Sequence, residues 1–488
     1  VSRLILTARY WKLLPSSFRR RIADYTSINE MVPHGYARDL AQAGEQAINA
    51  GVDMDMQGAV FMEHLGQSLA AGRVDMAQID RAVRRILEMK YRLGLFEDPY
   101  RYADQARQEA TLYRPEFLEA ARDVARKSMV LLRNEGGVLP IAANARSIAL
   151  IGPLADSKAD MIGSWSAAGD RQTRPVTILE GLRARAPEGV TIAHARGASY
   201  AFEDEGSTEG FAEALALAAR SDLIIAAMGE RWDMTGEAAS RTSLDLPGNQ
   251  QALLEALVAT GKPVVLVLLS GRPNSIEWAA GHVPAILHAW YPGTMGGHAV
   301  ADVLFGDYNP SGKLPVTFPR TVGQVPIHYD MKNTGRPIEL GEANAKYVSR
   351  YLNTPNDPLY RFGHGLSYTS FSYSPVTLSA PGMGPGGTIT ASATITNTGA
   401  RAGEEVVQLY VRDLVGSVTR PVQELKGFEK IALAPGESRT VRFTLAPADL
   451  AFTRADMSYG WEPGEFQLWI APRSGADAAA PVTFTLSD

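Results

Sequence analysis

The stretch PVVLVLLSG, residues 263–271, decides the fold, because it is a short and nearly all-apolar run that ends in a Ser-Gly turn. Such a run is typical of a strand that is buried on both faces of a sheet. Three similar runs are SIALIG at 147–152, DLIIAAMG at 222–229 and PAILHAW at 284–290. Helical stretches such as Phe211–Arg220 and Asn249–Thr260 separate them. This alternation predicts an α/β domain with a mostly parallel sheet, and ligands usually bind at the carboxyl ends of such strands.

The sequence pattern changes to a period of two residues after about residue 371. Four strand candidates carry the alternation: TITASATITN (388–397), EVVQLYVRD (405–413), RTVRFTLAP (439–447) and GEFQLWIAP (464–472). We expect about seven short strands in this region, which predicts an antiparallel sandwich of the fibronectin type III kind. Residues 321–370 are rich in Pro, Gly, Asn and Tyr and predict an irregular connector.

The first 105 residues predict mainly helix, with one short strand candidate at Ala50–Met56 (AGVDMDM). The best helix candidate is Asp75–Tyr91, because Asp75 can cap it and Gln78 stands where a capping-box partner belongs. An apolar stripe at helical spacing follows: Ile79, Val83, Ile86 and Leu87.

Composition excludes several classes of function. A length of 488 residues suggests about three domains. The net charge of −5 argues against nucleic acid as a partner, and we interpret the basic cluster Arg19-Arg20-Arg21 as a solvated segment. There is no cysteine, and no apolar run reaches the roughly 18 residues of a membrane span. Residues 1–14 lack the layout of a signal peptide.

Metal and cofactor sites are not expected. His34, His288, His298 and His364 have no metal-ligand spacing, and we interpret them as structural. The glycine-rich stretch GTMGGHAVADVL (293–304) lacks the lysine of a phosphate loop and the glycine spacing of a dinucleotide site. These glycines therefore predict close packing of the backbone.

Several segments in fixed order carry a resemblance to a known family. ADYTSINEMVPHG (23–35) resembles the nucleophile segment of glycoside hydrolase family 3, and GEAASRTSLDLPGNQ (236–250) is similar to its acid/base loop. Similarity to periplasmic bacterial β-glucosidases of this family is carried by IGPLADS (151–157) and GSWSAAGD (163–170). Further matching segments are AINAGVDMDM (47–56), 72–100, SMVLLRNEGGVLPI (128–141), 306–320, 362–371 and PVQELKGFEKIALAPGES (421–438).

The resemblance implies a domain order and a reaction. Residues 1–105 would be the remnant of a (β/α)₈ barrel, followed by an α/β sandwich domain at 106–330, a connector at 331–370 and a fibronectin-like domain at 371–488. The reaction implied is retaining, exo-acting hydrolysis that releases terminal β-D-glucose from a β-glucoside or short β-gluco-oligosaccharide. No cofactor is implied, and the location implied is the periplasm or the exterior.

The same resemblance implies site residues. Asp24 would be the nucleophile and Glu237 the acid/base, with Glu230 as the nearest competitor for the second role. Tyr25 and Trp165 would offer aromatic faces to a sugar ring. Arg241 would either hold the loop or contact the sugar.

One departure from the family keeps alternatives open. Only about 105 residues precede the second domain, whereas a (β/α)₈ barrel typically uses about 250. Losing three charged hydrogen bonds to the sugar would cost about 4–9 kcal/mol, or roughly three to six orders of magnitude in rate. An alternative is therefore a catalytically impaired remnant that acts as a carbohydrate-binding or assembly module. β-Xylosidase and β-N-acetylglucosaminidase activities also stay open, although the loop at 236–250 argues against the second. Exposed apolar surface would favour a homo-oligomer.

Overall fold

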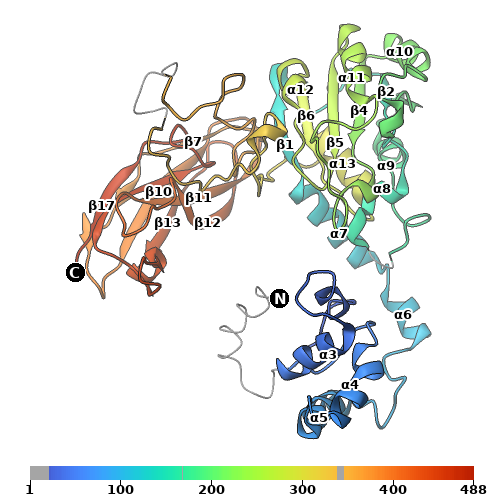
Figure 1. Ribbon diagram of the computed structural model, residues 1–488. Coiled ribbons are helices and arrows are strands. Elements are labelled where there is room, and N and C mark those ends of the chain that lie inside the picture. Colours follow the sequence, from blue (N-terminus) through green and yellow to red (C-terminus); the bar gives the residue numbers. More distant parts are fainter. Residues whose placement is uncertain (1–20, 167–168, 338–345) are drawn as a thin grey trace. The chain divides into compact units, whose positions relative to one another are not determined.

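The computed structural model describes residues 21–166, 169–337 and 346–488, and the chain divides into two compact units, Val1–Leu112 and Tyr113–Asp488 (Figure 1). Each unit is described by itself. The interpretations of residues 1–14 and of most of the Arg19–Arg21 cluster fall outside the described residues and stay predictions. The domain boundaries at 105, 330 and 370 also stay predictions.

The first unit is mainly helical, as its sequence predicts. Its helices are α3 (Leu40–Asn49), α4 (Val60–Ala70), α5 (Met76–Arg92) and α6 (Gln105–Thr111), with a 3₁₀ turn at η2 (Asn29–Met31). The capped helix expected at 75–91 is confirmed as α5, and the Gln78 side chain accepts a hydrogen bond of 2.9 Å from the Asp75 amide. The strand expected at Ala50–Met56 is reduced to one parallel bridge, between Ile22 and Met54.

The apolar stripe of α5 is only partly covered. Ala82 is buried and Ile79 packs against the small core beneath it, whereas Val83 and Leu87 are 50% and 45% exposed. The expected homo-oligomer stays a prediction. Within the described ranges, no helix has the length and hydropathy that crossing a membrane requires.

The second unit begins with a six-stranded sheet. Its strands are β1 (Val130–Asn134), β2 (Ser147–Ile151), β3 (Thr191–Ala195), β4 (Leu223–Gly229), β5 (Val264–Leu269) and β6 (Ala285–His288). They lie in the order β1-β6-β5-β4-β2-β3, and every neighbouring pair is parallel except β1 with β6. The four strands predicted from apolar runs are therefore confirmed as β2, β4, β5 and β6, and the mostly parallel sheet is confirmed with them.

Helices cover both faces of this sheet (Figure 1). One face packs against α7 (Pro115–Ser128), α9 (Ile178–Arg185) and α13 (Gly296–Phe305), and the other against α10 (Phe211–Ala219), α11 (Gln250–Ala259) and α12 (Glu277–His282). Alternate residues of one strand serve opposite faces: Ile225 contacts the first group and Ile224 the second. The helices expected at 211–220 and 249–260 are confirmed as α10 and α11.

The glycines of 293–304 allow two helices to approach closely. A Cβ atom on Gly297 would lie 1.9 Å from the carbonyl oxygen of Thr177, and one on Gly181 would lie 2.0 Å from that of Gly297. Helices α9 and α13 therefore touch through their backbones, which confirms the packing role that the sequence predicts.

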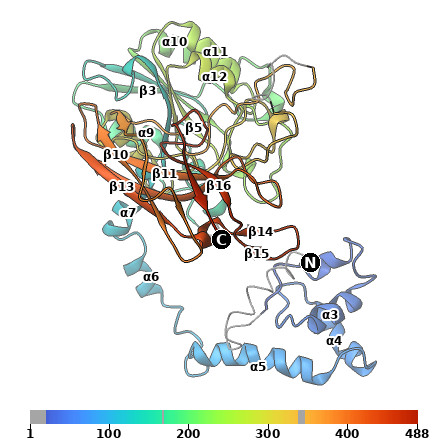
Figure 2. The ribbon, with the colours of Figure 1, turned by 90° about the vertical axis from the view of Figure 1, so that its left-hand side faces the viewer.

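The carboxy-terminal part is a β-sandwich (Figure 2). One sheet joins β13 (Ser438–Leu445), β10 (Ile389–Asn397), β7 (Phe371–Tyr373) and β8 (Thr377–Leu378); the other joins β12 (Glu424–Leu433), β11 (Gly403–Asp413), β16 (Gly464–Ala471), β17 (Val482–Leu486) and β9 (Gly382–Met383); a separate ribbon pairs β14 (Phe452–Thr453) with β15 (Tyr459–Gly460). Alternate residues of β10 are buried. The four predicted strands are confirmed, as is the irregular connector in its described part, where η7 (Val322–Gln324) is the only helical turn.

A hydrogen bond and an ion pair join the sandwich to the α/β domain within the second unit. Glu404 accepts a hydrogen bond from the Tyr308 hydroxyl at 2.8 Å and forms an ion pair with Lys430 at 3.0 Å. Lys313 forms an ion pair at 3.0 Å with Glu405, which is 4% exposed. These contacts place the end of the α/β domain against strand β11.

Candidate active site

Asp24 lies directly after the parallel bridge of the first unit. The Ala23 amide donates to the carbonyl of Met54 at 2.9 Å, and the Thr26 amide donates to the carbonyl of Met56 at 3.1 Å. Asp24 itself is exposed, and its Oδ1 accepts a hydrogen bond of 2.7 Å from the amide of Tyr25. An accessible carboxylate that follows such a bridge is able to attack a bound molecule.

Tyr25, the predicted sugar contact beside Asp24, is 63% exposed. Its ring is therefore free to lie against a ligand, and the role stays a prediction.

A buried ion pair anchors the segment that carries Asp24. Asp53 is 6% exposed; its carboxylate accepts hydrogen bonds from Arg85 of α5 at 2.8 and 3.2 Å and from the backbone amide of Arg21 at 3.0 Å. The carboxylate thereby ties the start of the Asp24 segment to a helix. No role was assigned to Asp53 from the sequence. An acid inside an apolar strand candidate could have indicated a buried ion pair, because buried charges are usually paired.

Glu237 lies on the long loop between β4 and α11. The loop turns sharply at this point, because Gly236 and Ala238 on either side have φ angles of +95° and +55°. Glu237 is exposed, and no hydrogen bond or ion pair to another described residue holds its carboxylate. A carboxyl group in this position is accessible to an external proton acceptor.

Glu230, the competing acid, has a different environment. It is 0% exposed, and it forms ion pairs with the guanidinium groups of Arg241 and Arg272. The Ser270 hydroxyl also donates to Glu230 at 2.7 Å. A sealed carboxylate between two cations is unsuited to giving a proton to a substrate, which leaves Glu237 as the glutamate of this loop that solvent reaches.

Arg241 holds this loop. Besides its ion pair with Glu230, it donates to the carbonyl oxygen of Asp245 at 2.9 Å. Its guanidinium lies 5.4 Å from the ring centroid of Phe202. The side chain is 8% exposed, and the contact with sugar that the sequence leaves open stays a prediction.

Trp165 lies next to the Glu237 loop. Its side chain belongs to η4 (Ser164–Ser166) and is 75% exposed. A Cβ atom on Gly236 would lie 3.3 Å from Trp165 Nε1, so the tip of the loop and the aromatic ring are neighbours. Arg171 fixes the tryptophan segment by donating to Ser166 Oγ at 2.9 Å.

The beginning of the loop is fixed by buried polar groups that sequence reasoning missed. The Trp232 amide donates to Asp160 Oδ1 at 2.6 Å, and the hydroxyl of Tyr291 donates to the carbonyls of Glu230 and Arg231, each at 3.1 Å. Burial raises the pKa of Asp160 and that of Tyr291. Their signal in the sequence was weak, because neither residue lies inside an assigned motif.

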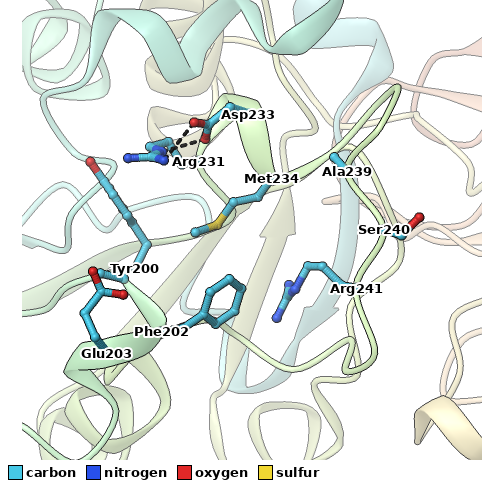
Figure 3. Close-up of a pocket in the computed structure, with 10 residues that line it drawn as sticks. Tyr200, Phe202, Glu203, Arg231, Asp233, Met234, Ala239, Ser240 and Arg241 are labelled. Carbon is cyan, nitrogen blue, oxygen red and sulfur yellow. Dashed lines mark hydrogen bonds and ion pairs between the residues drawn. The ribbon is translucent and has the colours of Figure 1, made fainter.

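A cleft of about 330 Å³ opens beside this loop (Figure 3). It is lined by Tyr200, Ala201, Phe202, Glu203, Arg231, Asp233, Met234, Ala239, Ser240 and Arg241. Figure 3 shows the ion pair between Arg231 and Asp233, whose Nη2 and Oδ2 atoms are 2.7 Å apart. The Arg231 guanidinium also lies 5.3 Å from the centroid of the Tyr200 ring. Among the described residues, no group of acidic or histidine side chains has the arrangement of a metal site.

Comparison with known proteins fits this geometry. Residues 129–368 match the glycosyl hydrolase family 3 C-terminal domain, and residues 405–474 match the fibronectin type III-like domain. A periplasmic β-glucosidase of Salmonella typhimurium is 44% identical over 482 residues, which cover 94% of this chain and 62% of the relative. The chain belongs to glycosyl hydrolase family 3. The resemblance found in the sequence is thereby confirmed.

Two further members of glycosyl hydrolase family 3 are similar along most of the chain. A β-xylosidase of Formosa agariphila is 38% identical over 464 residues, covering 93% of this chain and 62% of the relative. A solved β-glucosidase of Listeria innocua in complex with glucose has a TM-score of 0.89 and 34% identity, covering all of this chain and 64% of that one. The chain thus spans somewhat less than two thirds of the length of these relatives.

Proposed function

We propose that this family 3 chain belongs to a retaining, exo-acting β-glycoside hydrolase that releases terminal β-D-glucose. In the first step, the Asp24 carboxylate attacks the anomeric carbon while Glu237 protonates the departing oxygen. In the second step, Glu237 accepts a proton from water, and that water breaks the bond between the sugar and Asp24. The two carboxyl groups must therefore hold different protonation states before the first step.

The observation that carries this proposal is the contrast between the two glutamates of the loop after β4. Glu230 is sealed between two guanidinium groups, whereas Glu237 is exposed at the tip of the turn. The exposed Asp24 at the end of a paired segment supports the other half of the mechanism. Trp165, beside the turn, is proposed to offer its ring to the sugar.

The substrate class follows from the relatives and stays part of the proposal. The similar Salmonella protein is a β-glucosidase and the solved Listeria structure holds glucose, which favours a β-glucoside or short β-gluco-oligosaccharide. The β-xylosidase relative keeps xylosides as the competing substrate. The periplasmic relative supports a location in the periplasm or outside the cell.

The proposal is tested by hydrolysis of an aryl β-glucoside, using the longest natural form of the protein that contains these residues. Asp24→Ala is expected to abolish turnover, and Glu237→Ala to lower it about 10²–10⁴-fold. Glu188→Ala, which removes an exposed acid in a turn far along the chain from both, serves as the control and should keep full activity. Full activity of Asp24→Ala would refute the assignment of the nucleophile.

Trapping the intermediate tests the same residue directly. A 2-deoxy-2-fluoro-β-glucoside with a good leaving group should form a stable ester, and peptide mass spectrometry should place it on Asp24. A label on Asp53 or Asp55 would show that another carboxylate attacks. Binding of glucosides without turnover or labelling would instead favour a carbohydrate-binding module.

A further inference from the structure

We infer that Arg272 is a positioning residue for the acid/base group, because its guanidinium fixes the turn that presents Glu237. The inference rests on the proposed role of Glu237 and goes beyond it by naming the group that sets its position. Arg272 follows strand β5, whereas the turn follows β4, so the two come together only in the folded sheet.

One nitrogen atom of Arg272 closes the turn. Nη2 donates to the carbonyl of Met234 at 2.5 Å and to that of Ala239 at 2.8 Å. The two carbonyls lie on either side of the segment 235–238, which contains Glu237. The segment is bracketed at both ends by a single rigid group, and Glu237 lies between the two contacts.

The turn needs such a support because its backbone is unfavourable. Ala238 has a φ angle of +55°, a region that residues with a Cβ atom seldom adopt because it is strained. Gly236 has a φ angle of +95°. The hydrogen bonds from Arg272 stabilise this conformation against relaxation of the turn.

The guanidinium is itself held by buried charge. Arg272 Nε lies 3.2 Å from Glu230 Oε2, and the Arg272 amide donates to Ser270 Oγ at 3.1 Å. The amide of Glu230 donates to the carbonyl of Leu269 at 2.9 Å, which ties this acid to the end of β5. The Arg272 side chain is 19% exposed. The position of the turn is therefore fixed by residues at the ends of the two central strands β4 and β5, and not by contacts between exposed loops.

This arrangement assigns Glu230 a part in catalysis without contact with substrate. Glu230 orients Arg272, Arg272 fixes the turn, and the turn sets the Glu237 carboxyl. A general acid must lie within hydrogen-bond reach of the oxygen that it protonates, and a displacement of about 1 Å costs about 10²-fold in rate.

The test compares leaving groups in Arg272→Met and in a matched control, Arg320→Met. Arg320 is also a partly covered arginine, 24% exposed, with one acidic partner, Glu277, and one carbonyl partner, Asp357, but it does not touch the loop. Both variants are made in the longest natural form of the protein. The measurements are kcat/KM for phenyl β-glucoside and for 2,4-dinitrophenyl β-glucoside, and kcat for the second substrate with and without azide.

A displaced acid affects only substrates that need protonation. Arg272→Met is expected to lose about 10²-fold on the phenyl glucoside and less than about threefold on the dinitrophenyl glucoside. Azide should accelerate its turnover of the second substrate, because azide needs no base. Arg272→Lys, which can bridge fewer of these acceptors, should fall between Arg272→Met and the wild type. Arg320→Met should change both substrates equally.

Three results would overturn the inference, and a fourth concerns the proposed function. Equal losses of Arg272→Met on both substrates, or no effect of azide, would show a general structural role. Amide hydrogen exchange in 234–239 that is no faster in Arg272→Met than in Arg320→Met would show that the guanidinium does not hold the turn. Full activity of Glu237→Gln on the phenyl glucoside would instead refute the proposed role of Glu237.

Discussion

The close crossing of α9 and α13 predicts that adding a single carbon atom at Gly181 lowers the stability of the protein. In Gly181→Ala, the new Cβ would lie 2.0 Å from the carbonyl oxygen of Gly297, whereas real Cβ atoms keep at least 3.0 Å. The two helices must therefore separate by about 1 Å, and the neighbouring Leu182 and Val300, both fully buried, lose contact. Overpacking of this kind costs about 1–3 kcal/mol, and we expect about 3 because the obstacle is backbone.

The matched control is Gly281→Ala in α12. No atom lies within 4 Å of a Cβ at this position, so the same substitution adds helix propensity without a clash and should stabilise by about 0.5–1 kcal/mol. Thermal unfolding followed by near-ultraviolet circular dichroism measures both. At about 2–4 °C per kcal/mol, Gly181→Ala should lower Tm by about 6–12 °C, and Gly281→Ala should leave it equal or higher. A Tm for Gly181→Ala within about 1 °C of the wild type would refute the argument.

Three other variants test separate features. Asp53→Ala breaks the ion pair with Arg85 and should destabilise the first unit by about 3 kcal/mol; faster hydrogen exchange in 21–56 would show this, and unchanged protection would contradict it. Burial holds the pKa of His364 at about 4, so the folded state stays unprotonated while the unfolded chain binds a proton near pH 6.5. Stability is thus fully present above pH 6.5 and falls by about 3 kcal/mol as pH decreases toward 4; urea titrations at pH 7 and 4.5 should show a smaller fall for His364→Gln, and equal falls would exclude this cause. Trp165→Ala should raise KM for an aryl glucoside about tenfold without changing Tm, whereas an unchanged KM would remove Trp165 from the sugar site.

The sheet was predictable where its strands are continuous apolar runs. Strands β2, β4, β5 and β6 are the four interior strands, and their only polar residues are Ser147 at the start of β2 and His288 at the end of β6. The sequence did not predict β1 or β3, which are the two edges of the sheet. Strand β3 includes His194 and has only partial burial, so its pattern resembles that of a loop.

The sequence identified the segments that carry the candidate site residues, but it did not predict how these residues contact one another in the fold. Family resemblance pointed to Glu237 and left Glu230, seven positions earlier, as a competitor; only the fold distinguishes a sealed carboxylate from an exposed one. The partnership of Glu230 with Arg272 arises because β4 and β5 are neighbours, and nothing local in either segment encodes it. Long-range ion pairs of this kind depend on register, which the sequence pattern leaves open.

The seam between the α/β domain and the sandwich limits how these two folds can be recombined. Tyr308 and Lys313 find their acidic partners on β11 of the other fold. A chimera that exchanged the sandwich for another of the same topology would leave the mostly buried ammonium of Lys313 without an acid unless the graft supplied one at position 405. It would also leave the Tyr308 hydroxyl without its acceptor unless the graft supplied an acid at position 404. The carboxy-terminal sandwich therefore depends on specific contacts with the α/β domain and cannot be exchanged as an independent module.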